Sequence, residues 1–259
     1  MLPELTQITL SIQDHIAHVS LNNPPVNAMS KTMNDELTDV MDYLGEINEA
    51  RVVVLSATGK VFCAGADLKG RADVIKGPGD MSAHSRRTRE AFHAIRECAK
   101  PIIIALDGPA LGAGLAIVAS ADLIVVSPRA NLGMPEIDVG LMGGCSHAMR
   151  LFGHAILREM ALTGRRIGGE ELYRLGVVNR LVSSEEVLPE ALSIAATIAA
   201  KSPASVRLTK HTMNTIEDMS LRDGYRYEQD MTAAIAKTAD AIEAKKAFLE
   251  KRTPVFRDE

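Results

Sequence analysis

The sequence predicts an α/β fold followed by a helical C-terminal region. Residues 51–56, 101–106 and 122–127 are dominated by β-branched and aliphatic residues, a composition typical of strands that are buried on both faces. Helical stretches lie between these runs, and this alternation produces parallel strands joined by crossovers. After about residue 155 the pattern is almost entirely helical. The boundary falls near residues 190–205, and we divide the chain into a core at 1–195 and a helical region at 196–259. The last predicted helices occupy residues 185–201, 203–215, 220–238 and 239–252.

The first part of the chain begins with a predicted β-hairpin. Residues 7–12 and 15–21 are short β-prone runs, and Gln13-Asp14 joins them. Residues 22–25, Asn-Asn-Pro-Pro, end the second strand because proline cannot donate a hydrogen bond to a neighbouring strand. Ser30 is a good N-cap for the helix after it. The apolar face of this helix is made by Met33, Leu37, Met41 and Leu44.

Composition and charge exclude several classes of protein. The net charge is -4 with both signs interspersed, so no basic stripe is present for a nucleic acid. No segment approaches the roughly 18 consecutive apolar residues of a membrane helix. The first ten residues lack the features of a secretory or transit peptide, and Cys63, Cys98 and Cys145 are scattered without the spacing of a metal site. We therefore expect a cytoplasmic protein with no nucleic-acid, membrane or metal partner.

Three glycine-containing segments are candidates for a functional site. Residues 59–68 and 107–114 each follow a predicted buried strand, and residues 134–144 contain the sequence Met-Pro-Glu. Glycine lets the backbone approach a ligand closely, and the helix that opens near Gly112 would present unpaired N–H groups to an anion. A second interpretation needs no ligand, because tight turns and a small-residue helix packed on a sheet have the same composition. Asp67, near the end of the first segment, is suited to capping the next element of the chain.

Glu136 is the carboxylate of the third segment. If it is buried among its apolar neighbours, its pKa would be raised and it could act as an acid or base near neutral pH. If the segment is an exposed loop, Glu136 is an ordinary surface charge. The sequence around it leaves both interpretations open.

Together, in this order and spacing, these segments resemble the crotonase (enoyl-CoA hydratase/isomerase) superfamily over essentially the whole chain. The resemblance is carried by NNPPVNAMS at 22–30, FCAGADL at 62–68, GPALGAG at 108–114, Pro135-Glu136, and FLEKRTPVF at 248–256. It implies a crotonase-like ββα spiral core, an acyl-CoA thioester as the substrate, and no cofactor other than the CoA that arrives as part of the substrate. It also implies that the C-terminal helical region forms a homotrimer or a hexamer built as a dimer of trimers.

The resemblance also assigns roles to individual residues. The backbone N–H groups of Ala66 and Ala113 would polarise the thioester carbonyl, and Glu136 would be the catalytic acid/base. Gly144 and His147 are candidates for an assisting role, although a structural role for His147 stays open. The CoA moiety would contact Pro25, Val26, Asn27, Phe62, Ala64, Asp67, Leu68, Lys69 and Lys251. Lys251 could reach it from a neighbouring subunit, and both lysines could equally be solvated surface charges.

One position departs from the family pattern. Family hydratases carry a second glutamate one turn after the second N–H donor, and this chain has Ala116 there. One acid/base is enough to move a double bond, so the sequence slightly favours an isomerase-like reaction at Glu136. A hydratase, an acyl-CoA decarboxylase or hydrolase, and a non-catalytic acyl-CoA-binding protein remain alternatives. The acyl pocket would be shaped by residues 71–89, where Arg86-Arg87 could meet an acidic acyl chain or form a solvated helix face.

Overall fold

The centre of the molecule is a six-stranded sheet. The computed structural model describes residues 2–258, apart from the side chains at positions 71 and 72. The strands are β1 (Ile8–Gln13), β2 (Ile16–Leu21), β3 (Val52–Ala57), β4 (Ile102–Leu106), β6 (Leu123–Val126) and β9 (Arg180–Leu181), in the order β1-β2-β3-β4-β6-β9. Only β1 runs antiparallel to its neighbour, and the other pairs within this described sheet are parallel. The predicted parallel α/β core is therefore confirmed.

The predicted hairpin forms, but its turn lies one residue later than expected. Asp14 and His15 both have positive φ, 50° and 64°, so they are the two central residues of the turn. Two consecutive positive φ values match the twist of a tight hairpin, which lets the ladder pair Gln13 with Ile16. Gln13 is thus the last residue of β1 rather than part of the turn.

Helices cover both faces of the sheet. On one face lies α1 (Lys31–Glu46), which begins where Ser30 Oγ accepts the Met33 N–H at 3.0 Å. Its predicted apolar face is fully buried beside α3 (Asp80–Glu97). On the other face lies α8 (Val187–Ala199), whose alanines pack on β3, β4 and β6. The remaining short helices of the core are α2 (Leu68–Val74), η1 (Pro135–Val139), α5 (Cys145–Ala148), α6 (His154–Thr163), α7 (Gly169–Arg174) and η2 (Ser184–Glu186).

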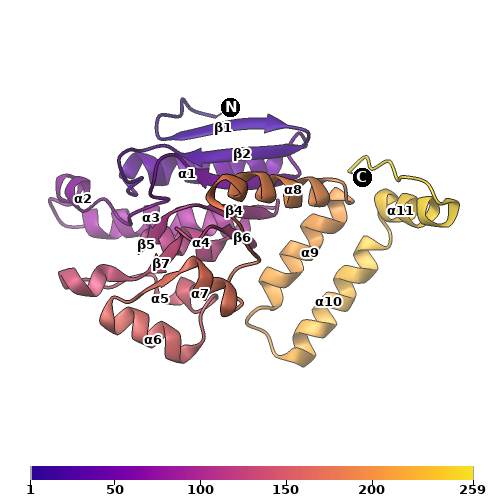
Figure 1. Cartoon of the computed structure of the whole chain (residues 1–259). Helices are drawn as coiled ribbons and strands as arrows, with labels where there is room; N and C mark the ends of the chain where they lie inside the picture. Colours follow the sequence, from indigo (N-terminus) through magenta and orange to yellow (C-terminus); the bar gives the residue numbers. More distant parts are fainter. Residues whose placement is uncertain (1, 259) are drawn as a thin grey trace.

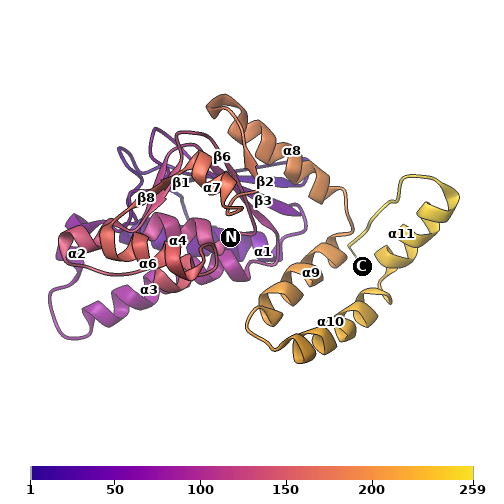
Figure 2. The same cartoon turned by 60° about the horizontal axis from the view of Figure 1, so that its bottom comes forward.

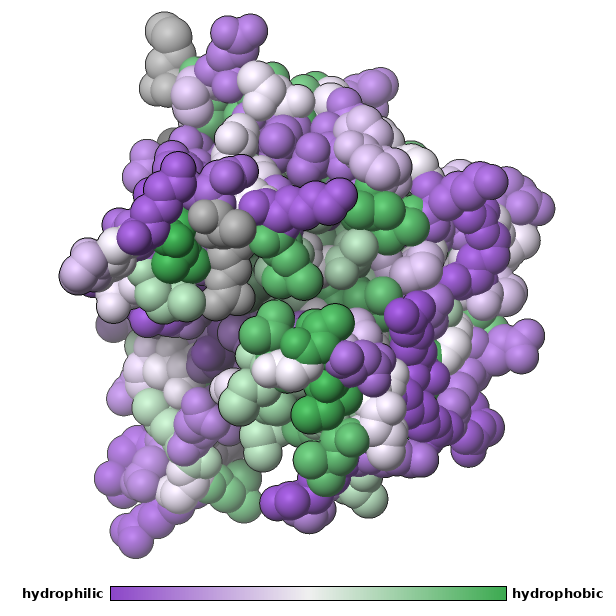
Figure 3. Space-filling view, turned by 90° about the vertical axis from the view of Figure 1, so that its left-hand side faces the viewer, coloured by the Kyte–Doolittle hydropathy of each residue, from purple (hydrophilic) through white to green (hydrophobic). Residues whose placement is uncertain are grey.

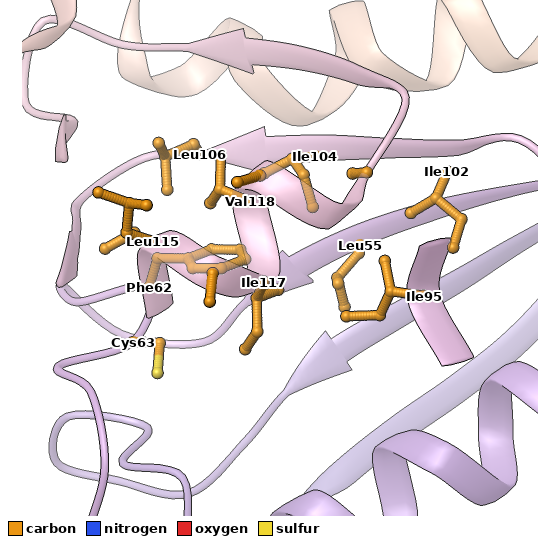
Figure 4. Close-up of a cluster of buried hydrophobic side chains, with 14 of the residues drawn as sticks. Leu55, Phe62, Cys63, Ile95, Ile102, Ile104, Leu106, Leu115, Ile117 and Val118 are labelled. Carbon is orange, nitrogen blue, oxygen red and sulfur yellow. The ribbon is translucent and has the colours of Figure 1, made fainter. Parts of the chain in front are cut away.

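A second, small sheet was not predicted. It contains β5 (Pro109–Leu111), β7 (Asn131–Gly133) and β8 (Arg166–Gly168), and β5 leads directly into α4 (Ala113–Ser120). Three-residue strands are too short to show a periodic pattern. Leu115, Ile117 and Val118 of α4 point into the apolar core beneath the large sheet, as Figure 4 shows. The start of α4 is therefore held rigidly on the core.

The C-terminal helices extend away from the sheet. α9 (Pro203–Ile216), α10 (Leu221–Ile235) and α11 (Ala239–Glu250) lie at the opposite end of the molecule from α2 (Figures 1 and 2). The division at residues 195 and 196 stays a prediction, and α8 spans that boundary while packing on the sheet. Large apolar side chains are exposed in this region at Met213, Met219, Leu221, Tyr225, Ile242, Phe248, Leu249 and Val255. None of the helices in the described part of the chain is long and apolar enough to cross a membrane.

Candidate active site

Two loops that follow neighbouring strands are joined by their backbones. Cys63, in the loop after β3, forms an isolated parallel bridge with Ala110 after β4. The Leu111 N–H donates to the Cys63 carbonyl at 2.9 Å, and the Cys63 N–H donates to the Pro109 carbonyl at 3.1 Å. A Cβ added at Gly114 would overlap the Cys63 carbonyl oxygen, so glycine is needed where α4 meets the first loop. The two loops are held together as one unit.

The backbone N–H of Ala66 points away from the segment at Met29, with which Ala66 is paired. In the parallel bridge between Ala66 and Met29, the hydrogen bonds to Met29 are made by Gly65 and Asp67, the two neighbours of Ala66, and not by Ala66 itself. Met29 donates to the Gly65 carbonyl at 2.8 Å, and Asp67 donates to the Met29 carbonyl at 3.2 Å. In such a pattern the bridged residue directs its own N–H to the opposite side. The Ala66 N–H is therefore available to a ligand.

Ala113 offers a second N–H close by. It is the first residue of α4, and the first N–H groups of a helix have no carbonyl partner within the helix. A Cβ added at Gly65 would lie 3.8 Å from the Ala113 nitrogen, which shows how near the first loop comes. Neither the Ala66 nor the Ala113 N–H donates a backbone hydrogen bond within residues 2–258. Two unpaired N–H groups on adjacent rigid loops suit an oxygen that develops negative charge.

Both alanines line a cavity of about 940 Å³. Its other walls come from α3, from η1 with the loop after it, and from the start of α5. Figure 3 shows the face at the α2 end of the molecule, where hydrophobic residues gather near the centre among hydrophilic ones. Val139 and Met142, on the cavity lining, are both exposed. The size and largely apolar edge of the cavity suit a small organic ligand.

Glu136 lies in this cavity beside the Ala113 donor. It is on η1, and its carboxylate packs directly over Gly112, because a Cβ added at Gly112 would overlap Oε1 and lie 3.0 Å from Cδ. Oε2 is buried and has no hydrogen-bond partner among the described residues. Burial raises the pKa of Glu136. The interpretation of Glu136 as an ordinary surface charge is therefore wrong, because its carboxyl is partly buried on the cavity lining.

His147, on α5, lines the same cavity. Its ring packs edge-on against Phe92 of α3, with the ring centroids 5.1 Å apart. Burial lowers the pKa of His147, and the nearby His93, Arg150 and Arg96 lower it further. Ala116 lines the same cavity and has no group that can transfer a proton, and Gly144 also lines it, immediately before α5. The structure thus brings both candidates for an assisting role to the cavity.

The residues expected near CoA divide into two groups. Ala64 and Leu68 line the cavity. Phe62 is only 2% exposed and points into the apolar core in Figure 4, so its side chain cannot contact a ligand. Asn27 is 1% exposed, and its Nδ2 donates to the carbonyls of Thr58 and Val61 at 2.9 and 2.8 Å. The side chains of Phe62 and Asn27 therefore shape the loops.

The other expected CoA contacts lie on the surface. Asp67 caps α2, as predicted, by accepting the N–H groups of Lys69 and Gly70 at 3.1 and 3.0 Å. Lys69 is exposed beside the cavity loop. The Val26 carbonyl accepts the Ala64 N–H at 3.0 Å, which places the exposed Pro25 next to that loop as well.

Lys251 is not brought to the cavity by its own chain. It follows α11, at the opposite end of the molecule from α2 (Figures 1 and 2). A contact between Lys251 and a ligand in this cavity would require another subunit.

One wall of the cavity lies within residues 71–89, the segment expected to shape the acyl pocket, but its individual residues were not singled out. His84, Ser85, Thr88 and Arg89 of α3 line it, one or two turns before Phe92. The sequence drew attention to Arg86-Arg87 instead, but Arg87 pairs with Asp35 at 2.6 Å. The helical spacing of 85, 88, 89 and 92 could have identified this face.

Comparisons with known proteins give a consistent result. The enoyl-CoA hydratase/isomerase family matches residues 11–259. The (7aS)-7a-methyl-1,5-dioxo-2,3,5,6,7,7a-hexahydro-1H-indene-carboxyl-CoA hydrolase of Rhodococcus jostii is 33% identical over 241 residues, covering 93% of each chain. A carnitinyl-CoA dehydratase of Escherichia coli is 32% identical over 93% of this chain and 95% of its own. The crystal structure of enoyl-CoA hydratase from Bacillus anthracis has a TM-score of 0.92 and 30% identity, over 98% of this chain and 100% of the other.

A match over nearly the whole chain, in sequence and in structure, confirms the resemblance and the crotonase-like core. The relatives' names, a hydratase, a dehydratase and a hydrolase, share an acyl-CoA substrate but differ in reaction. The chain belongs to the enoyl-CoA hydratase/isomerase family of acyl-CoA enzymes.

Proposed function

We propose that this enzyme stabilises the enolate of an acyl-CoA thioester and moves protons on its acyl chain with Glu136. The thioester oxygen would accept the N–H groups of Ala66 and Ala113, each of which is worth about 3 kcal/mol of transition-state stabilisation in comparable sites. The observation that carries the proposal is the packing of the Glu136 carboxylate over Gly112, next to the Ala113 donor. A base in that place can reach a C–H bond beside the polarised carbonyl.

Migration of a double bond in an enoyl-CoA is the reaction that these groups support best. Glu136 would remove a proton from one carbon of a 3-enoyl-CoA, giving a dienolate whose negative charge rests on the thioester oxygen. The same carboxyl would then return the proton at another carbon, which yields the 2-enoyl-CoA. Ala116 supports this choice, because the cavity holds no carboxylate at the position where a second one would activate water.

Hydration of a 2-enoyl-CoA is a second candidate, and His147 favours it. Its ring lies in the same cavity as Ala116, and its lowered pKa keeps it neutral at neutral pH, so it can accept a proton from water. The hydratase name of the Bacillus anthracis neighbour supports the same reading. In this reaction His147 would act as the second acid/base, a role for which Ala116 has no suitable group.

We further propose that CoA lies along residues 25–27 and the loop at 62–69, and that Lys251 of a neighbouring subunit reaches it. The apolar side chains exposed on α9–α11 support assembly into a homotrimer or a dimer of trimers, because patches of this kind mark protein–protein contacts. Light scattering in solution should give the mass of three or six chains. A monomer at micromolar concentration would contradict the assembly and the role of Lys251.

The experiment that tests the function compares two substrates and three proteins. Wild type, Glu136→Gln and Asp138→Asn are incubated with a 3-enoyl-CoA and with a 2-enoyl-CoA, and products are followed by mass and absorbance. Asp138 is the matched control, since it is a carboxylate on the same η1 segment. We expect Glu136→Gln to slow the reaction by about 10²–10⁴-fold, the usual contribution of a general base, and Asp138→Asn to retain it.

The products separate the two candidate reactions. Migration of the 3-enoyl double bond without a gain in mass supports the isomerase. A gain of one water from the 2-enoyl-CoA supports the hydratase. Unchanged rates in Glu136→Gln would show that this carboxyl is not the base.

A further inference from the structure

We propose that the acyl chain of the substrate carries a carboxylate remote from the thioester, and that Arg89 and Thr88 on α3 bind it. This inference rests on the proposed acyl-CoA function and names the class of acyl group. The residues that support it are the polar side chains of the cavity wall described above, which the proposed chemistry does not use.

The wall formed by α3 is polar where a plain alkyl chain would need it to be apolar. Ser85, Thr88 and Arg89 line the cavity, together with Phe92 at its inner end. Phe92 touches His147, and along a helix Thr88 and Arg89 lie about 5 Å before Phe92 and Ser85 about 10 Å before it. A hydrocarbon tail laid along this wall would remove water from these polar groups and give no hydrogen bond in return. A polar end group would satisfy them.

Thr88 is the first specific observation. Its Oγ1 is buried and has no hydrogen-bond partner among the residues that the structure describes. Buried hydroxyl groups are normally paired, and one that lines a ligand cavity unpaired is best explained by a partner on the ligand. A threonine hydroxyl can donate to a carboxylate oxygen.

The second observation concerns Arg89, which is paired less firmly than Arg87 on the same helix. Arg87 is held by Asp35 at 2.6 Å, which fixes it outside the cavity. Within the described part of the chain Arg89 forms an ion pair with Glu90 alone, through Nε at 3.4 Å, and both of these side chains are more than half exposed. Such a long exposed pair contributes little. The two terminal nitrogens of Arg89 are left to form the paired hydrogen bonds that a carboxylate accepts.

The acidic groups of the cavity do not cancel this charge. The Glu136 carboxylate packs over Gly112, immediately before α4. Asp138 also lies on the lining, but a Cβ added at Gly164 would be 3.0 Å from both of its carboxylate oxygens. Gly164 is not part of the cavity wall, so the Asp138 carboxylate faces away. Arg89 is thus the charge that an acyl chain would meet.

The test measures binding without turnover. Isothermal titration calorimetry is run with hexanoyl-CoA, hexanedioyl-CoA and the methyl monoester of hexanedioyl-CoA, which keeps the length but removes the charge. We expect wild type to bind hexanedioyl-CoA about 10–100-fold more tightly than the other two, the usual gain from hydrogen bonds to a charged group. Arg89→Ala should bring the ratio close to one, and Thr88→Val should lower it in part without weakening the binding of hexanoyl-CoA.

Arg86→Ala is the matched control. It removes the same charge from an exposed position on α3 that does not line the cavity, so the ratio should stay at its wild-type value. Equal affinities of wild type for the three esters would overturn the proposal, as would an equal loss in Arg86→Ala and Arg89→Ala. Binding of none of them would overturn both this proposal and the acyl-CoA function.

A parallel assay of hexenoyl-CoA and hexenedioyl-CoA, each with its double bond at C2 and at C3, separates the remaining cases. Preferential binding of the dicarboxylic ester with no turnover would support the carboxylate site and contradict the proposed chemistry. Equal turnover of both substrates with equal binding would support the chemistry and contradict the carboxylate site.

Discussion

Gly112→Ala should inactivate the enzyme by displacing Glu136. The added Cβ would overlap Oε1 and lie 3.0 Å from Cδ, so the carboxyl must retreat by on the order of 1 Å to reach ordinary contact distance. Displacement of a catalytic group by about 1 Å can cost about 10²-fold in rate. Gly112 also has φ 54° and ψ −113°, a conformation that residues with a Cβ rarely adopt, so about 1–3 kcal/mol of stability should be lost as well.

The assay must separate these two effects. The rate on the better enoyl-CoA substrate is measured beside a urea unfolding curve for Gly112→Ala and for two control variants. Gly143→Ala adds a methyl group on the same cavity lining with no atom within 4 Å. Gly59→Ala adds a Cβ to a residue whose φ is already 83°, in the left-handed region. The added atom has no neighbour within 4 Å, and Gly59 lies outside the cavity.

We expect Gly143→Ala to keep both rate and stability, and Gly59→Ala to lose stability alone. A wild-type rate in Gly112→Ala would refute the placement of Glu136 as the base. A rate in Gly59→Ala as low as in Gly112→Ala would show that backbone strain, and not the displaced carboxyl, is responsible.

The pH, the histidine and a buried ion pair give three more predictions. Because burial raises the pKa of Glu136 above its ordinary value of 4.5, the rate should rise with pH through a value above 4.5. Because burial makes ionisation of Glu136 unfavourable in the folded state, wild type should lose stability relative to Glu136→Gln as pH rises through that range. A difference in melting temperature between the two proteins that does not vary with pH would contradict this. His147→Ala should abolish water addition but spare double-bond migration if hydration depends on this ring, and equal loss of both would indicate a structural role. Lys210→Met should lower the free energy of unfolding by about 3–5 kcal/mol, because it leaves Asp122, 2.8 Å away, without its cation and the Lys100 carbonyl without a donor; an unchanged urea midpoint would contradict this.

The parts of the fold that the sequence predicted are those set by local patterns. The runs at β3, β4 and β6 are buried on both faces, so they are almost entirely apolar and stand out in the sequence. Ser30 and the apolar positions of α1 follow the helical repeat and begin and bury as expected. The small sheet of β5, β7 and β8 could not be found this way, because its strands are defined by partners distant in sequence.

The site was predicted in part for the same reason. Glycines and Glu136 mark the loops after β3 and β4 and the segment of η1, and the order of these segments is visible in the sequence. The direction in which a side chain points is not visible, so Phe62 and Asn27 were expected near CoA although both are buried. The α3 wall lies within the segment expected to shape the acyl pocket, but its individual residues were not identified, because they become neighbours of Glu136 only when α3 packs beside α4 and α5.

The two N–H donors belong to the main chain, and this limits how evolution can remove them. Almost any side chain at positions 66 and 113 leaves the N–H in place, so the proposed activation of the thioester depends on the joined backbones of the two loops and not on residue identity. Proline is the replacement that deletes the donor, and at Ala113, the first position of α4, it can do so without breaking the helix. The α3 wall of the proposed acyl pocket, in contrast, is made by side chains, so a substitution there changes it directly. Substitutions on α3 would therefore change the proposed acyl pocket while leaving the proposed activation of the thioester in place.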